Sequence, residues 1–324
     1  MDTFQRCRKA FEKASWSYED SMGDLTLDFE RRFLPKGLCG QNYPAWITAE
    51  QSLLLNQIRG YSYAHIFVFI EQFIIQQTHM SSAGYMHVDS DALSTMLKFA
   101  DEELKHQRMF EHLKDLIEEG LPVRPNELAG KEALAGEVCS KMPMAVYLVI
   151  LATEWLTQRH YLECFKEDED ALDASFVKVF RLHWAEEAQH ARADALELQS
   201  LASGMDDQAI QAALTQAIDI FGMLMGLLAE QSRLDVQTFE RIVGDIGSSR
   251  REELVSLLTS ESCWTFVYSG LEHNAFVDVY RRVIPEALMS AEAVLEAVAA
   301  VGAQISQPLD HSEYGSLQEN AASK

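Results

Sequence analysis

Two short motifs place a glutamate three residues before a histidine. They are Glu103–His106 in the segment EELKHQ and Glu187–His190 in the segment EEAQHA. Residues three apart lie on one face of an α-helix, so each motif can present a carboxylate and an imidazole to one ion. Oxygen and nitrogen donors of this kind suit transition metals. Spacing alone is weak evidence, because a chain with 50 acidic residues and 10 histidines also places such pairs on exposed helix surfaces by chance.

The residues around each motif indicate that the carboxylates are buried. Each motif lies on a stripe of residues spaced three and four apart, apolar at both ends and polar only in the middle. The first stripe is Ala92, Met96, Phe99, Glu103, His106, Phe110, Leu113 and Ile117. The second is Phe176, Phe180, His183, Glu187, His190, Asp194, Leu198 and Leu201. Stripes of this kind face the core of a protein, where a carboxylate is costly unless it is paired or bound to a metal.

Two further glutamates stand alone in apolar helical segments. Glu71 lies in AHIFVFIEQFII and Glu154 in AVYLVILATEWL, each at nearly the same interval before one of the two motifs. The chain therefore repeats one unit, a helix with a buried glutamate followed by a helix with Glu-x-x-His. This is the ligand arrangement of di-iron and di-manganese carboxylate bundles. The alternative, buried acids paired with arginine or lysine, is disfavoured because no basic residue lies on the four stripes.

The rest of the sequence predicts helices that can position these side chains. Helical patterns cover residues 48–80, 90–119, 142–167 and 172–202, and then 206–232, 235–246, 249–260 and 276–303. No segment shows a convincing strand-like alternation, and the 16 glycines and 7 prolines are few for a turn-rich protein. We therefore predict an all-α fold with a four-helix bundle at its core and additional N- and C-terminal helices.

The composition of the chain excludes some binding partners and indicates a cellular location. The net charge of −23 and the absence of a lysine and arginine cluster argue against nucleic acid and against an anionic membrane surface. The apolar runs at 66–75 and 144–152 are too short to span a bilayer. The five cysteines are widely spaced without a CxxC pair, which predicts buried, reduced thiols, and the N-terminus has no secretory apolar region. We expect a cytoplasmic protein.

A third histidine, His183, precedes Glu187 by one helical turn and gives the motif H-x-x-x-E-x-x-H. Here the sequence resembles the p-aminobenzoate N-oxygenase family, which includes the arylamine oxygenase of chloramphenicol biosynthesis. The resemblance covers about residues 60–195 and implies a ferritin-like bundle. It also implies oxidation of an aromatic amine toward hydroxylamine, nitroso or nitro products. The positions that match the family's metal ligands are Glu71, Glu103, His106, Glu154, His183, Glu187 and His190.

The resemblance also implies cofactors and partners. We expect two iron ions per chain, dioxygen as co-substrate, a small-molecule substrate and a homodimer. The sequence has no GxGxxG fingerprint and no cysteine cluster, so we expect no bound flavin or nicotinamide. Electrons would then come from a separate reductase or ferredoxin. Whether the substrate arrives free or attached to a carrier protein stays open.

The expected organisation is a single ferritin-like di-iron domain at 47–303. An N-terminal leader at 1–46 would pack on it, and a disordered tail would follow at 304–324.

Four more residues are candidates for supporting roles. Asp194 lies one turn after His190 on the same stripe, where its carboxylate can accept the N–H of a ligand imidazole. Asp101 has either the same role or a surface position. Thr157 and Gln158 lie one turn beyond Glu154 and are candidates for hydrogen bonds to a metal-bound oxygen species. Beyond these two, we predict no catalytic residue other than the ligands.

Three other functions share the predicted metal site. One is a different di-iron oxidation, such as hydroxylation or desaturation of an acyl or carrier-bound substrate, although those enzymes usually lack the ligand at His183. Another is a radical-generating subunit like that of ribonucleotide reductase, which keeps a tyrosine at the position of Phe110. The third is iron storage or a structural metal bundle. Storage ferritins are shorter chains that assemble into cages, so the size of the assembly separates this class.

Overall fold

The computed structural model describes residues 3–305 of the chain. Within that range the protein is built of helices, and the β-type pairing consists of one isolated bridge between Arg32 and Leu172. The predicted all-α, ferritin-like fold is confirmed. Of the segment 304–324, Gln304 and Ile305 end the last helix, and the rest lies outside the described residues.

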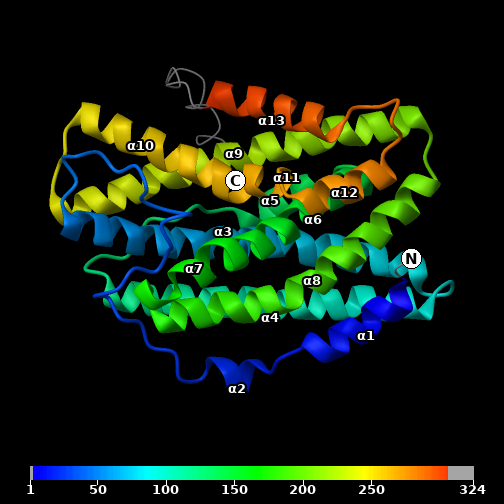
Figure 1. Cartoon of the computed structure of the whole chain (residues 1–324), viewed down its shortest axis with the longest axis horizontal. Helices are drawn as coiled ribbons and strands as arrows, with labels where there is room; N and C mark the ends of the chain where they lie inside the picture. The colour runs from blue at the N-terminus through cyan, green and yellow to red at the C-terminus, as the bar shows by residue number, and fades with distance from the viewer. Residues whose placement is uncertain (1–2, 306–324) are drawn as a thin grey trace, which may run out of the picture.

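Four helices form the bundle that carries the predicted ligands. They are α3 (Ala49–Tyr85), α4 (Ser90–Gly120), α6 (Pro143–Arg159) and α8 (Ala174–Ser203). Helix α3 packs along α4, α6 packs along α8, and α4 also contacts α8 (Figure 1). A short turn joins α3 to α4, whereas a long connection containing α5 (Lys131–Cys139) joins the two pairs. A bundle of two helix pairs with one long crossover is the ferritin-like topology.

The bundle helices begin at residues that satisfy their free N–H groups. Thr48 forms a capping box with Gln51 at the start of α3. The Asp89 side chain accepts two backbone N–H groups at the start of α4. Asp173 caps α8 in the same way, and Pro143 occupies the first position of α6, where its missing N–H costs nothing. Local sequence therefore fixes where each ligand-bearing helix starts.

The remaining helices cover two sides of the bundle. On one side, α1 (Phe4–Ala14) contacts α4 and α8, and α2 (Tyr18–Met22) contacts α4. The other side carries α9 (Asp207–Val243), α10 (Ser248–Cys263), α12 (Asn274–Val283) and α13 (Ala291–Ile305). Figure 1 shows α1 and α2 below the bundle and α9, α10 and α13 above it. Helices α1 and α2 therefore pack on the bundle, while the leader at 1–46 and the division into domains stay predictions.

Two π-helical segments interrupt the regular helices. The segment η1 (His160–Phe165) continues α6 into α7 (Lys166–Asp168), followed by the 3-10 turn η2 (Glu169–Ala171). The segment η3 (Trp264–Tyr268) joins α10 to α11 (Ser269–Leu271). Segments of this kind often mark functional positions in helices.

Some predicted helix boundaries differ from the structure. The predicted break between residues 232 and 235 is wrong, because α9 continues through these residues. They include no glycine or proline that would end a helix, and Arg233 pairs with Glu230 one turn earlier at 2.9 Å. The predicted helix 276–303 is two helices, α12 and α13, since the chain leaves the helix next to Pro285. Helix α5 was not predicted.

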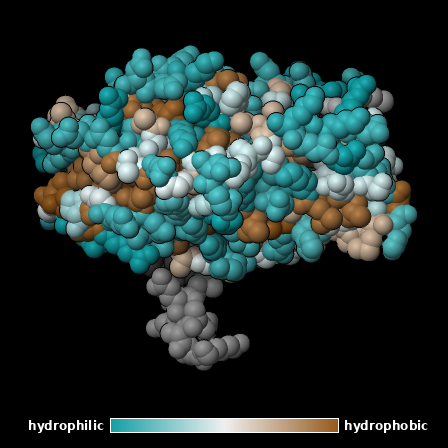
Figure 2. Space-filling model, turned by 90° about the horizontal axis from the view of Figure 1, so that it is seen from below, coloured by the Kyte–Doolittle hydropathy of each residue, from teal (hydrophilic) through white to brown (hydrophobic). Residues whose placement is uncertain are grey.

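Helix α9 is long and apolar enough to cross a membrane by length and composition alone. Half of its most apolar window is buried, and α9 contacts α3, α6, α10 and α13. These contacts are those of a core helix. The face shown in Figure 2 is mostly hydrophilic with separate hydrophobic patches. All five cysteines are buried without forming a disulfide, as the sequence predicts.

A close approach between α11 and α6 gives a test of this packing. A Cβ atom on Gly270 would lie 2.1 Å from the Ala152 carbonyl oxygen, on the helix that carries Glu154. Gly270→Ala should lower the free energy of unfolding by about 1–3 kcal/mol, because backbone must move to make room. Gly226→Ala on α9 is the matched control, since nothing lies within 4 Å of its Cβ position. It should raise stability by about 0.5–1 kcal/mol. Urea unfolding measures both, and equal midpoints would contradict the packing described.

Candidate metal centre

The seven predicted ligands converge from the four bundle helices. They are Glu71 on α3, Glu103 and His106 on α4, Glu154 on α6, and His183, Glu187 and His190 on α8. None of these residues is more than 2% exposed. The apolar stripes that predicted buried carboxylates are therefore turned toward one another in the core.

Six of the seven form two adjoining groups of potential ligand atoms. One group is Glu103, His106, Glu187 and His190, and the other is Glu71, His106 and His183. Within each group, the ligand atoms all lie within 4.8 Å of one another. Because His106 belongs to both groups, the two positions are neighbours. Two neighbouring positions of this kind fit a pair of metal ions.

Distances within the cluster show which ring nitrogens face its centre. His190 Nδ1 lies 2.7 Å from Glu103 Oε1 and 2.9 Å from Glu187 Oε2. His183 Nε2 lies 2.6 Å from Glu187 Oε1 and 3.2 Å from Glu71 Oε1. The third histidine therefore points into the cluster, as its place on the α8 stripe predicts.

Glu154 belongs to neither group but lies beside the cluster. Its Oε2 atom is 3.9 Å from His190 Nδ1. Its role as a ligand stays a prediction.

Many polar atoms of the cluster lack a hydrogen bond although they are buried. They are Glu71 Oε2, Glu103 Oε1, His106 Nδ1, Glu154 Oε1 and Glu187 Oε1. Buried polar atoms without partners cost free energy, and so many in one place call for an explanation. Divalent ions bound by these carboxylates and imidazoles would supply the missing partners. The residue set therefore fits a two-metal site.

Burial and close contact shift the pKa values of these groups in opposite directions. Burial raises the pKa of Glu154 well above its usual range, and the Glu187 charge adds to this. Burial also opposes the ionisation of Glu187, but His183 and His190 outweigh it and hold its pKa well below the usual range. Burial lowers the pKa of His106, yet the carboxylates, Glu187 first, outweigh burial and raise it to about 9. At neutral pH the metal-free site therefore holds protons, which incoming metal ions must displace.

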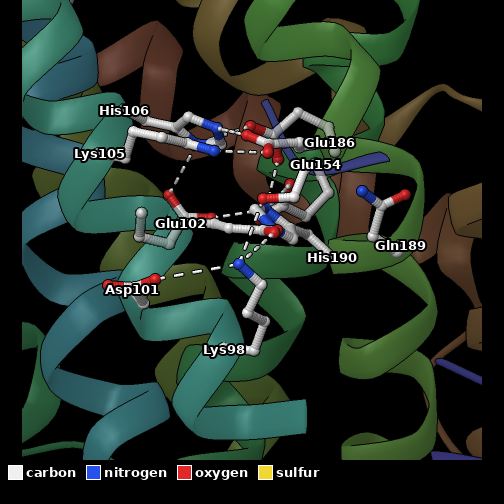
Figure 3. Close-up of polar contacts among 12 residues, drawn as sticks. Lys98, Asp101, Glu102, Lys105, His106, Glu154, Glu186, Gln189 and His190 are labelled. Atoms are coloured by element: carbon white, nitrogen blue, oxygen red, sulfur yellow. Dashed lines mark hydrogen bonds and ion pairs between the residues drawn. The ribbon is translucent and has the colours of Figure 1, made fainter. Parts of the chain in front are cut away.

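Two glutamates that were not predicted orient the ligand histidines. Glu186 Oε2 on α8 lies 2.8 Å from His106 Nε2 on α4, and Glu102 Oε2 on α4 lies 3.0 Å from His190 Nε2 on α8 (Figure 3). An ionised carboxylate only accepts hydrogen bonds, so Nε2 of each ring is the donor. The other nitrogen, Nδ1, is then left as the metal-binding atom.

Two lysines pair with these glutamates, and we call Glu102, Glu186, Lys98 and Lys105 the outer layer of the site. Lys105 Nζ lies 2.5 Å from Glu186 Oε1, and Lys98 Nζ lies 3.3 Å from Glu102 Oε1. The sequence signal for the outer carboxylates is the doubled glutamate in EELKH and EEAQH. Neighbouring residues point about 100° apart around a helix, so the first glutamate of each pair faces the adjacent helix instead of the stripe.

The predicted supporting residues have different positions. Asp101 is a surface residue with a side chain 75% exposed, 3.9 Å from Lys98, so Glu102 and not Asp101 contacts the ligand ring (Figure 3). Asp194 is fully buried, burial raises its pKa well above the usual range, and neither carboxyl oxygen makes a hydrogen bond. Its role beside a ligand stays a prediction.

Thr157 and Gln158 are buried on α6 and bonded to backbone. The Thr157 hydroxyl donates to the Thr153 carbonyl at 3.1 Å, and Gln158 Nε2 donates to the Trp184 carbonyl at 3.1 Å. These hydrogen bonds give both side chains a structural role, and a catalytic role stays a prediction.

Aromatic rings enclose the imidazoles. The ring of Phe99 stacks on His190 at 4.2 Å between centroids. Phe67 and Phe110 meet the edge of His183 at 5.0 and 4.9 Å. These rings keep water from the ligands and lower the local dielectric, which strengthens the electrostatic interactions inside the cluster.

The N-terminal segment also covers the centre. Phe11 on α1 stacks on His190 at 5.3 Å, and Trp16 stacks on His106 at 6.4 Å. The Trp16 backbone N–H donates to Glu186 Oε1 at 3.2 Å. This segment therefore touches two ligands and one of the carboxylates that orient them.

The fold and the cluster together define a ferritin-like helical protein with a buried carboxylate and histidine cluster that could hold metal ions. The family model of the p-aminobenzoate N-oxygenase AurF matches residues 18–255, which include all seven predicted ligands. This chain belongs to that family, and it is an oxidoreductase of the di-iron monooxygenase class. No curated protein matches the chain. Phe11 and Trp16 precede the matched residues.

Adjacent acids on α4 allow a direct test of the outer layer. Glu102→Ala should weaken Fe(II) binding about 10–100-fold, because the His190 ring loses the acceptor that orients it. Asp101→Ala is the matched control and should leave the affinity unchanged, since Asp101 faces solvent. Competition with a chromogenic chelator measures both dissociation constants. Equal losses in the two variants would mean that surface charge, not ring orientation, sets the affinity.

Proposed function

We propose that this protein is a di-iron N-oxygenase that uses dioxygen and external electrons to oxidise the nitrogen of a small amine. An arylamine is the favoured substrate, with hydroxylamine, nitroso or nitro compounds as products. The observation that supports this chemistry best is the position of His183. Its ring nitrogen faces Glu71 and Glu187 inside the cluster, as the family motif requires, and the family match spans the whole site.

Within this proposal the chain's own residues position the metals and keep water away. Bound iron supplies the reaction with dioxygen. The six side chains of the two groups, together with Glu154, would hold the ions, and Glu102 and Glu186 fix the orientation of two rings. His183 adds a third imidazole to the cluster, and burial lowers the pKa of this ring below its usual value. Phe67 and Phe110 pack against this ring and exclude solvent from it.

The proposal includes an outside source of electrons. A reductase or ferredoxin would supply them, since the sequence carries no dinucleotide fingerprint and no cysteine cluster. Delivery of the substrate by a carrier protein is a further possibility. We place the protein in the cytoplasm, a reducing compartment in which its buried thiols would persist.

Iron loading and an amine screen test the proposed reaction. Protein loaded without oxygen should hold about two iron ions per chain and give a transient visible band when dioxygen is added. Arylamines should then yield N-oxygenated products by mass spectrometry. His183→Ala should shorten the life of the band and lower product formation, because one donor is lost. His112→Ala is the control, since its ring contacts Tyr18 away from the cluster.

The outcomes separate the metal site from the reaction. Two bound irons without oxidation of any amine would leave the site standing and refute N-oxygenation. A folded helical protein that binds no iron would refute both.

We also propose that the protein is a homodimer, as the family resemblance implies. Light scattering on a sizing column should give twice the mass of the chain. A cage-sized assembly would favour iron storage, and a monomer would contradict the dimer.

A further inference from the structure

Tyr63 and His160 form a buried pair outside the metal cluster. The Tyr63 hydroxyl is hydrogen-bonded to His160 Nδ1. His160 Nε2 lies 3.1 Å from Ser269 Oγ, and Ser269 Oγ lies 2.6 Å from the Thr265 carbonyl oxygen. None of the four residues is more than 3% exposed. A phenol, an imidazole and a hydroxyl are thus linked in one chain of hydrogen bonds.

The donor and acceptor capacities of these groups fix the direction of each hydrogen bond. The Thr265 carbonyl can only accept, so the Ser269 hydroxyl donates to it and accepts from His160 Nε2–H. Burial lowers the pKa of His160 to about 3, so the ring is neutral and carries one N–H. Its Nδ1 lone pair then accepts the hydrogen bond of the Tyr63 hydroxyl. His160 Nδ1 is therefore the atom that faces the phenol proton.

Both π-helical segments contribute to this arrangement. His160 is the first residue of η1, directly after the helix that carries Glu154. Thr265 lies in η3, and Ser269 follows it. Widened helical turns from two parts of the chain therefore meet beside one tyrosine, and such turns are frequent at functional sites.

Aromatic contacts connect Tyr63 with the metal centre. Tyr63 lies on α3, two turns before Glu71, and its ring centroid is 5.2 Å from that of Phe67. The Phe67 ring meets His183 at 5.0 Å. One phenylalanine therefore separates the phenol from a ligand histidine. Electron transfer over so short a path through packed rings does not require either group to move.

We propose that Tyr63 is a redox-active tyrosine that gives one electron to the dioxygen-oxidised iron centre when no substrate is bound. The phenol O–H bond breaks, its proton moves to His160 Nδ1, and its electron passes by way of Phe67 to the centre. Tyr63 becomes a neutral phenoxyl radical, His160 an imidazolium, and the centre is reduced by one electron. An electron from the external donor and return of the proton restore the phenol. This inference relies on the proposed function only for the oxidised centre.

Freeze-quench electron paramagnetic resonance tests the inference on the full chain. Iron-loaded protein mixed with dioxygen, without an amine, should give a tyrosyl radical signal. Tyr63→Phe should abolish it, whereas Tyr147→Phe, a change at an equally buried tyrosine, should retain it. His160→Gln should lose most of the signal, because the proton acceptor is replaced, while its iron content stays at the wild-type level. His160 belongs to neither ligand group.

A second measurement does not depend on how well the variants fold. Incorporation of 3-fluorotyrosine at position 63 should add a fluorine splitting to the signal and so assign the radical. A signal without this splitting, or one that persists in Tyr63→Phe, overturns the inference. Iron-loaded protein that oxidises amines but gives no radical also overturns the inference, and this outcome leaves the proposed function intact. Protein that binds no iron overturns both.

Discussion

The burial of four carboxylates in an apolar bundle is the constraint on which the rest of this structure depends. Each carboxylate is almost free of solvent contact, and a charge in that position must be neutralised or shared. The three imidazoles provide part of the compensation, which is why His106 gains a proton affinity far from that of a solvated histidine. Ligand atoms without hydrogen bonds remain. The metal-free bundle therefore carries an electrostatic cost that bound ions would remove, so metal binding and stability are linked.

The outer carboxylates, Glu102 and Glu186, connect the two helices that carry the Glu-x-x-His motifs. Glu186 on α8 holds a ring on α4, and Glu102 on α4 holds a ring on α8. The contact is reciprocal, so a shift of either helix disturbs both rings together. Lys98 and Lys105 balance the charge of this layer and lie nearer the surface. The precision of the site thus comes from the contact between α4 and α8 as much as from either helix alone.

The sequence predicts side-chain patterns that repeat along one helix, but it does not predict contacts between two helices. The stripes through Glu103 and Glu187 predict the four-helix bundle. Six of the seven predicted ligands fall into the two groups of potential metal-binding atoms. Glu102 and Glu186 are missed because their partners lie on the opposite helix. Asp101, for which either this role or a surface position was predicted, faces solvent. The π-helical segments carry no glycine or proline, so no local signal predicts them. Tertiary contacts, not propensity, decide these positions.

The position of α1 has a consequence for the order in which the protein assembles. Its packing partners, α4 and α8, are synthesised after it, so α1 cannot reach its final position until these later helices have formed. Phe11 and Trp16 then close over imidazoles that are already in place. Until that moment the site is open on this side. The N-terminal segment therefore completes this side of the cluster last, although it comes first in the sequence of the helices described here.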